Sequence, residues 1–150
     1  MIAIVQRVTS AKVTIAGEIV GQVGRGMVVL ATVEAADTDA DLLWAAQKLA
    51  TLRIFQNGDK AFDVDVKQIG GSILLVSNFT VAAETTKGRR PGFSAAAPPE
   101  QGRLMFEKFI DLVRAQDVPV QTGRFGADMA VELVNDGPAT FVVKSPPKNA

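Results

Sequence analysis

The sequence predicts a single α/β domain with many short strands and two main helices. Its 150 residues amount to about one domain. The first third of the chain is rich in β-branched and apolar residues bounded by glycine turns, a pattern typical of strands. Two later segments, near residues 38–50 and 99–116, combine a helix-start signal with apolar residues at helical spacing.

The first strands are expected before residue 34. Residues that favour strands are Ile2, Ile4, Val8, Val13, Ile15 and the segment Glu18 to Val23, with a turn at Ala16-Gly17. Gly24-Arg25-Gly26 predicts a second turn before the strand Met27 to Val33. Because that strand is apolar throughout, we expect it to be covered on both faces and central in its sheet.

Capping residues and the spacing of apolar residues predict two helices. Thr38 can cap the first helix, and Asp41 completes a capping-box pattern. Its buried face would consist of Leu42, Leu43, Ala46, Leu49 and Ala50. Pro99 suits the first turn of the second helix, which would run to about Gln116. Its buried stripe would consist of Met105, Phe106, Phe109, Leu112 and Val113.

The remaining segments complete one domain over residues 1–145. We expect strands at Arg53 to Phe55, Ser72 to Phe79, Pro119 to Gln121, Met129 to Asn135 and Thr140 to Lys144, and a tight turn at Asn57-Gly58. Residues 81–99 lack periodicity and hold three prolines, so they predict a long functional loop. The polar tail, residues 146–150, is expected to be frayed.

Composition limits the chemistry that the chain can perform. It has no cysteine, histidine or tyrosine, so thiolate nucleophiles and serine–histidine pairs are excluded. Asp37, Asp39 and Asp41 suit a helix start, and Asp63 and Asp65 should reach solvent, so we expect no metal and no cofactor. The first residues predict a strand rather than a signal peptide, and the apolar runs are too short to span a bilayer. A cytoplasmic protein with no membrane partner is therefore expected.

Four motifs could carry a function. Ser77-Asn78-Phe79-Thr80 ends a buried strand, where α/β folds place ligand-binding groups, although a strand that turns polar as it surfaces would look the same. Thr80 lacks a histidine to activate it as a nucleophile. Lys87, Arg89 and Arg90, with Phe93, suit phosphate contacts and base stacking, and the alternative is a solvated turn.

The other two motifs are rich in glycine. The segment 122–129 matches neither the phosphate-loop nor the dinucleotide-binding spacing of glycines, so by itself it is only weak evidence of a function. The segment 135–140 can be a plain turn between two strands. Alternatively, a cis bond between Gly137 and Pro138 would aim two successive carbonyl oxygens at a ligand and read its stereochemistry.

Together these motifs resemble those of the D-aminoacyl-tRNA deacylases, in order and spacing from residue 1 to about 143. The resemblance rests on Gln6-Arg7-Val8-Thr9 and on the four motifs above. It implies mixed β-sheets in a barrel-like β/β/α arrangement. It also implies a homodimer that binds the 3′ end of aminoacyl-tRNA and hydrolyses the ester of D-amino acids, and of glycine misattached to alanine tRNA.

The resemblance also assigns roles to residues of this chain. Gly137 and Pro138, inserted into the pocket of the partner, would reject L-amino acids, and Arg7 would orient them. Phe125 and Met129 would line the pocket, and Lys87, Arg89 and Arg90 would contact tRNA. The catalytic segment would be Ser77 to Thr80, with backbone N–H groups near Phe79 and Thr80 binding the oxyanion and the 2′-hydroxyl of the tRNA activating water.

One residue departs from the family pattern. Asn78 stands where the family usually has glutamine, and its amide is one methylene shorter. A contact made by the amide tip could be lost or bridged by water. A non-catalytic module that binds an aminoacyl group or an RNA end on the same fold is therefore the alternative.

Overall fold

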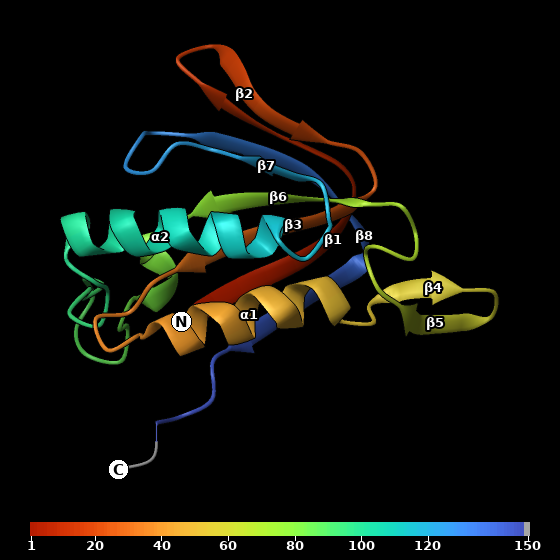
Figure 1. The fold of residues 1–150 in the computed structure, drawn as a ribbon. Helices are drawn as coiled ribbons and strands as arrows, with labels where there is room; N and C mark the ends of the chain where they lie inside the picture. The colour runs from red at the N-terminus through yellow and green to blue at the C-terminus, as the bar shows by residue number, and fades with distance from the viewer. Residues whose placement is uncertain (149–150) are drawn as a thin grey trace.

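The computed structural model describes residues 1–148 (Figure 1). Its elements are β1 (Ile2–Ile15), β2 (Glu18–Val23), β3 (Gly26–Thr32), α1 (Asp39–Thr51), β4 (Phe55–Asn57), β5 (Lys60–Val64), β6 (Ser72–Ser77), the 3-10 helix η1 (Phe79–Ala82), α2 (Pro99–Arg114), β7 (Val120–Thr122) and β8 (Ala130–Lys144). The predicted α/β domain with two main helices is confirmed.

The main sheet is organised around the long strand β1. The first half of β1 pairs antiparallel with β3, its second half pairs with β2, and β8 pairs with both halves. β3, β6 and β7 run parallel, so the sheet is mixed, in the order β2-β1-β3-β6-β7. β2 also lies against β6 and β7, and the sheet curls into a nearly closed, barrel-like shape.

The central strand β3 matches the prediction, since β1 and β6 flank it and nearly all of it is buried. It begins at Gly26 for a steric reason. A Cβ atom at Gly26 would lie 1.9 Å from the carbonyl oxygen of Ser72, which starts β6. Glycine therefore allows the two parallel strands to pair at this end.

Two apolar clusters hold the domain together. The larger lies between the sheet and the helices and includes Leu42, Leu49, Phe55, Phe106 and Phe109. The smaller lies within the curl of the sheet and includes Val8, Val13, Val23, Val28 and Leu74. Both faces of β3 are thus covered, which explains its continuous apolar sequence.

Both helices form where they were predicted, but one residue of the buried face of α1 and the last residue of α2 differ from the prediction. The Thr38 backbone N–H donates to Asp41 Oδ2 at 2.7 Å, so the capping box forms. The prediction was wrong for Leu43, which is exposed, whereas Ala45 is buried with the rest of the stripe. α2 ends at Arg114, two residues before the expected end. No helix within residues 1–148 is both long and apolar enough to cross a membrane.

The short hairpin of β4 and β5 corrects two expectations. The strand predicted for residues 53–55 begins at Phe55, and β5 was not foreseen. Asp63, expected to reach solvent, is only 16% exposed as a side chain because Arg53 and Asn57 hydrogen-bond to it at 2.8 and 2.9 Å. These hydrogen bonds, that of Asn57 foremost, lower the pKa of Asp63.

The C-terminal strands predicted separately for residues 129–135 and 140–144 form the single strand β8. Both halves pair with β1 in one direction, so the chain does not reverse. Gln6 pairs with Thr140 and Val8 with Asn135, which leaves Asp136 to Ala139 bulging opposite Arg7. The glycine–proline motif is thus a bulge within a strand rather than a turn between two strands.

Candidate functional site

A cavity of about 460 Å³ lies where the parallel strands β3 and β6 end. α2 and the loop between β7 and β8 complete its walls. It gathers five residues proposed from the sequence: Ser77, Asn78, Phe79, Phe125 and Met129. The carboxyl ends of parallel strands are a common place for ligands in α/β folds, so this cavity is the candidate site.

The segment Ser77–Thr80 turns sharply at the floor of the cavity. β6 ends at Ser77, two residues earlier than predicted, and the backbone N–H of Asn78 donates to Ala31 at 2.9 Å. η1 starts at Phe79, and the leading N–H groups of a helix have no acceptor within it. Thr80 lies outside the cavity lining, and its hydroxyl donates to the Asn78 side chain.

Phe125 and Met129 form the opposite wall, and two glycines make room for them. A Cβ atom at Gly123 would lie 2.5 Å from the sulfur of Met129. A Cβ atom at Gly102, in the first turn of α2, would touch the Phe125 ring at 3.4 Å. Small residues therefore set the position of both large side chains.

Several wall residues were missed in the sequence. Gly102, Val33, Ala96 and Ala97 all line the cavity. Gly102 and Val33 belong to a predicted helix and a predicted strand, and Ala96 and Ala97 to a loop, but no sequence signal indicates that these four residues meet at one cavity. Asp128, the single ionisable side chain of the lining, lay within a quoted motif but received no role.

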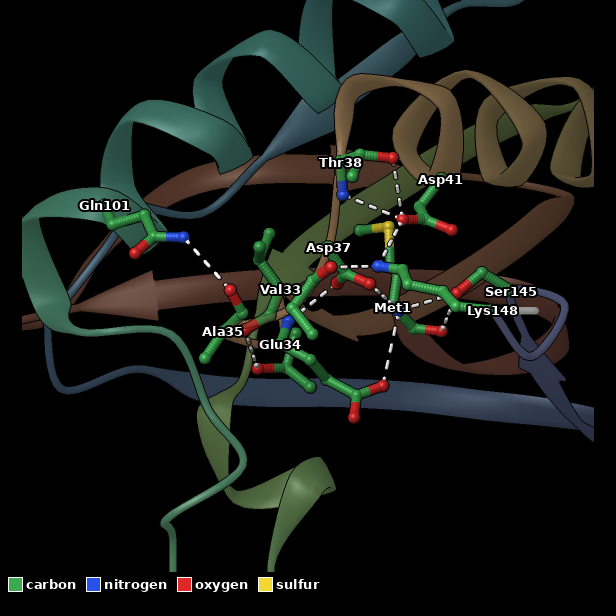
Figure 2. A network of polar contacts seen from close by, with 12 residues as sticks. Met1, Val33, Glu34, Ala35, Asp37, Thr38, Asp41, Gln101, Ser145 and Lys148 are labelled. Carbon is green, nitrogen blue, oxygen red and sulfur yellow. Dashed lines mark hydrogen bonds and ion pairs between the residues drawn. The ribbon is translucent and has the colours of Figure 1, made fainter. Parts of the chain in front are cut away.

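The wall formed by residues 33–35 and 95–97 is paired through its backbone. Ala35 donates to Ala95, and Ala97 donates to Val33, both at 3.0 Å. Figure 2 shows the polar network behind this wall, which contains the α-amino group of Met1 and the side chains of Glu34 and Asp37. A hydrogen bond from Gln101 to the Ala35 carbonyl, at 3.4 Å, ties the wall to α2.

The same network reaches the start of α1. Lys148 lies 2.8 Å from Asp41, so this part of the tail expected to be frayed contacts the domain, while residues 149–150 lie outside the described residues. The hydrogen bond with Lys148, followed by that from the Thr38 backbone, lowers the pKa of Asp41 to about 2. Asp41 thus stays ionised at neutral pH.

Arg7 contacts the bulge of β8. Its Nε donates to the Asp136 carbonyl, and one Nη donates to the Ile54 carbonyl, both at 2.8 Å. The guanidinium also lies 5.4 Å from the centroid of the Phe62 ring. Within the same bulge, the peptide bond between Gly137 and Pro138 is cis, and both residues are exposed.

The structure does not bring this bulge to the cavity of its own chain. Val131 of β8 lines the cavity, and Gly137 follows six residues further along the same strand. At about 3.3 Å per residue the two are roughly 20 Å apart. On β3, Arg7 pairs with Met27, whereas the cavity begins at Leu30.

Lys87, Arg89 and Arg90 lie on an exposed loop, and Phe93, which follows this loop, packs against the cavity residue Phe79. Glu84 and Gly92 pair through their backbones and close the loop. The Glu84 carboxylate accepts hydrogen bonds, above all from Thr86, and these lower its pKa. Within residues 1–148, none of the three cations forms an ion pair. Their charges are therefore available to an anionic ligand.

Metal-ligating side chains do not cluster in the described part of the chain. Over residues 1–148, no three acidic side chains are placed to hold a metal ion together. The cavity offers one carboxylate, at Asp128, and otherwise apolar groups, hydroxyls, amides and backbone atoms. These are the protein groups that would face a molecule bound in the cavity.

Known proteins are similar to this chain in sequence and in fold. The model of the D-Tyr-tRNA(Tyr) deacylase family matches residues 4–144. A D-aminoacyl-tRNA deacylase of Alteromonas mediterranea is 50% identical over 94% of this chain and 97% of its own. One of Geobacter sulfurreducens is 48% identical over 95% and 94%.

Among solved structures, the c-Myc DNA Unwinding Element Binding Protein superposes with a TM-score of 0.91. It is 36% identical and the match covers 98% of this chain and all of that one. The resemblance stated from the sequence motifs is confirmed, because the chain belongs to the D-Tyr-tRNA(Tyr) deacylase family.

Proposed function

We propose that the protein is a hydrolase that cleaves the ester between a D-amino acid and the 3′ end of tRNA. The observation that carries this proposal is the cavity, whose floor is Ser77 to Phe79 and whose rim adjoins the basic loop. An aminoacyl-adenosine end could enter it while the basic loop contacts phosphates. The names of the relatives support the substrate class.

The proposed mechanism uses few protein groups. The 2′-hydroxyl of the terminal adenosine activates a water molecule, which attacks the ester carbonyl and releases the 3′-hydroxyl. The backbone N–H groups of Phe79 and Thr80 would stabilise the developing oxyanion, and Ser77 and Asn78 would hold the ester in place. A chain without histidine or cysteine suits this scheme, which requires no cofactor.

Chirality would be read by Gly137 and Pro138 of a second copy of the chain. Two facts support this assignment: Gly137 and Pro138 are exposed, and Arg7 holds the Asp136 carbonyl directly before them. Because the bulge lies roughly 20 Å along β8 from the cavity of its own chain, it could act only on the cavity of a partner. The functional unit would be a homodimer.

Steric rejection of an L side chain has a consequence for substrate range. Glycine has no side chain to exclude, so glycine misattached to alanine tRNA would also be hydrolysed. Phe125 and Met129 would pack against the bound end, with stacking on the Phe125 ring. Such a proofreading enzyme would act in the cytoplasm, where aminoacyl-tRNA is used.

A second candidate function is a non-catalytic module that binds an aminoacyl group or an RNA end. The short amide of Asn78 in place of the usual glutamine favours it. The name of the 36% identical DNA unwinding element binding protein also points to nucleic-acid binding on this fold.

One experiment separates the two candidates. Purified protein is incubated with tRNA charged with a D-amino acid, its L enantiomer or glycine, and release of the amino acid is followed. Release of D-amino acids and glycine with L-esters intact supports the enzyme. Tight binding without release of any of them supports the module, and equal release of D and L refutes chiral rejection.

A further inference from the structure

The network in Figure 2 contains a buried ion cluster that the proposed mechanism does not use. The α-amino group of Met1 lies 2.5 Å from Asp37 Oδ1 and 3.3 Å from Glu34. The side chains of Met1 and Asp37 are 1% and 4% exposed. A buried charge is costly unless it is paired, so each of these two groups depends on the other.

Asp37 connects this cation to the cavity wall. Its second oxygen, Oδ2, accepts the backbone N–H of Glu34 at 2.7 Å, and its own N–H donates to the Glu34 carbonyl at 3.1 Å. Glu34 pairs with Ala96, a lining residue, and its neighbour Val33 also lines the cavity. Hydrogen bonds thus connect the amino group to Asp37 and Asp37 to Glu34, and the two neighbours of Glu34 hydrogen-bond to Ala95 and Ala97 across the wall.

Other contacts fix the amino group itself. Ser145, just after β8, accepts a hydrogen bond from it at 2.8 Å, and the Ser145 backbone N–H donates to the Met1 carbonyl at 3.0 Å. The cation is thus held at the end of the main sheet where the start of β1 pairs with the end of β8. The wall segment, which is otherwise a loop, is anchored to a rigid part of the fold.

We propose that the ion pair between the Met1 α-amino group and Asp37, with Glu34, holds the cavity wall of residues 33–35 and 95–97 in its binding position. Asp37 is a positioning residue, since it acts through the wall. Removing its charge, or acylating the amino group, would shift the wall and weaken substrate binding. This inference rests on the proposed function for its substrate, an aminoacyl ester with a terminal adenosine.

The test compares Asp37→Asn with Asp39→Asn, a matched control that removes the same charge from an exposed position two residues away. A chain with an acetylated α-amino group tests the cation. For Asp37→Asn and the acetylated chain we expect KM for D-aminoacyl-tRNA to rise about tenfold with kcat nearly unchanged, because a displaced wall loses contacts that the bound substrate and the transition state share. Asp39→Asn should resemble the unaltered protein.

Hydrogen exchange gives a readout independent of catalysis. Backbone amides of Ala35 and Ala97 should exchange faster in Asp37→Asn, whereas those of the β4–β5 hairpin should not change. An unchanged KM and unchanged exchange at the wall would overturn the proposal, as would an equal rise in exchange throughout the domain. If Asp37→Asn does not fold, Glu34→Gln is tested in its place. We expect this variant to raise KM about two- to fivefold, the effect of losing a partly exposed ion pair.

If the unaltered protein hydrolyses no ester, the proposed function fails but the wall can still be tested. The probe is then adenosine carrying a D-aminoacyl group through a 3′-amide, which cannot be hydrolysed in the same way. Weaker binding of this probe by Asp37→Asn, together with faster exchange at the wall, supports the positioning role. Equal binding and equal exchange refute it.

Discussion

The rings of Phe79 and Phe93 meet edge to face with their centroids 5.1 Å apart. Phe79 lines the cavity, and Phe93 follows the basic loop in sequence. This contact joins the loop to the floor of the cavity, so Lys87, Arg89 and Arg90 are presented beside its rim. The arrangement suits a ligand whose tip enters the cavity and whose phosphates lie behind it, beside the basic loop.

Neutralising Arg89 and Arg90 together should weaken tRNA binding and reduce its salt dependence. Each lost phosphate contact lowers the log–log slope of affinity against salt by roughly one unit. Binding is measured by titration at several salt concentrations, with Lys60→Ala on the distant β5 as the control. An unchanged slope in the double variant would assign the loop a structural role.

Thr80→Ala should keep substantial activity. Thr80 lies outside the cavity lining, and its hydroxyl donates a hydrogen bond to the Asn78 amide oxygen rather than to a general base, so it is not activated as a nucleophile. In contrast, a tRNA ending in 2′-deoxyadenosine should be nearly inert as a substrate. Deacylation rates with both substrates check this, and a trapped acyl-threonine would contradict it.

Arg7→Lys should weaken the discrimination between D and L esters. Arg7 reaches the Asp136 and Ile54 carbonyls at 2.8 Å with two separate nitrogens, whereas lysine has a single nitrogen, so we expect one of the two hydrogen bonds to be lost. Loss of one charged hydrogen bond, about 1.5–3 kcal/mol, would lower the D-to-L ratio of kcat/KM about 10- to 100-fold. Arg53→Lys, near the same hairpin, is the control, and an unchanged ratio for Arg7→Lys would remove Arg7 from chiral selection.

The sequence predicted the elements that depend on local chemistry. The apolar strand β3, the capping box at Thr38 and Asp41, and the proline at the start of α2 were all identified correctly. Each depends on residues close in sequence. The motif Ser77-Asn78-Phe79 was also placed correctly at a strand end that borders a cavity.

Features that depend on distant pairing were missed. β8 was divided at Gly137 because glycine and proline ordinarily end a strand, but β1 pairs with both halves and continues it through a bulge. The place of Val33, Ala96 and Ala97 in the cavity wall has no local signal, since it comes from backbone pairing between segments far apart in the sequence. The buried amino group of Met1 could not be inferred from residue types.

Asp41 should stabilise the fold above about pH 4 and lose this effect as the pH falls. Its folded pKa, about 2, lies below the ordinary 3.8, so folding favours the ionised form. The contribution, at most about 2 kcal/mol, is complete above the unfolded pKa and disappears as the pH falls through the folded value. Urea unfolding of Asp41→Asn should therefore approach that of the unaltered protein between pH 4 and 2, whereas a constant difference would contradict this.

The last prediction tests whether the bulge acts on a partner. Arg7→Ala chains keep their own cavity but should reject L-esters poorly. Gly102→Leu chains keep Arg7, Gly137 and Pro138, but the larger side chain would enter the cavity beside Phe125 and block it. A mixed dimer then contains one complete site: the cavity of the Arg7→Ala chain with the intact bulge of the Gly102→Leu chain.

Adding an excess of Gly102→Leu chains, with time for exchange of subunits, should therefore reduce hydrolysis of L-esters by a fixed amount of Arg7→Ala chains. Hydrolysis of D-esters should persist. The control adds chains that carry both substitutions, which can pair but offer no intact bulge. Because Gly137 lies roughly 20 Å along β8 from the cavity lining, the intact bulge of a chain cannot reject L-esters in the cavity of the same chain. L-ester hydrolysis that is unaffected by the excess, although mixed dimers form, would show that chirality is read within one chain or elsewhere in the cavity.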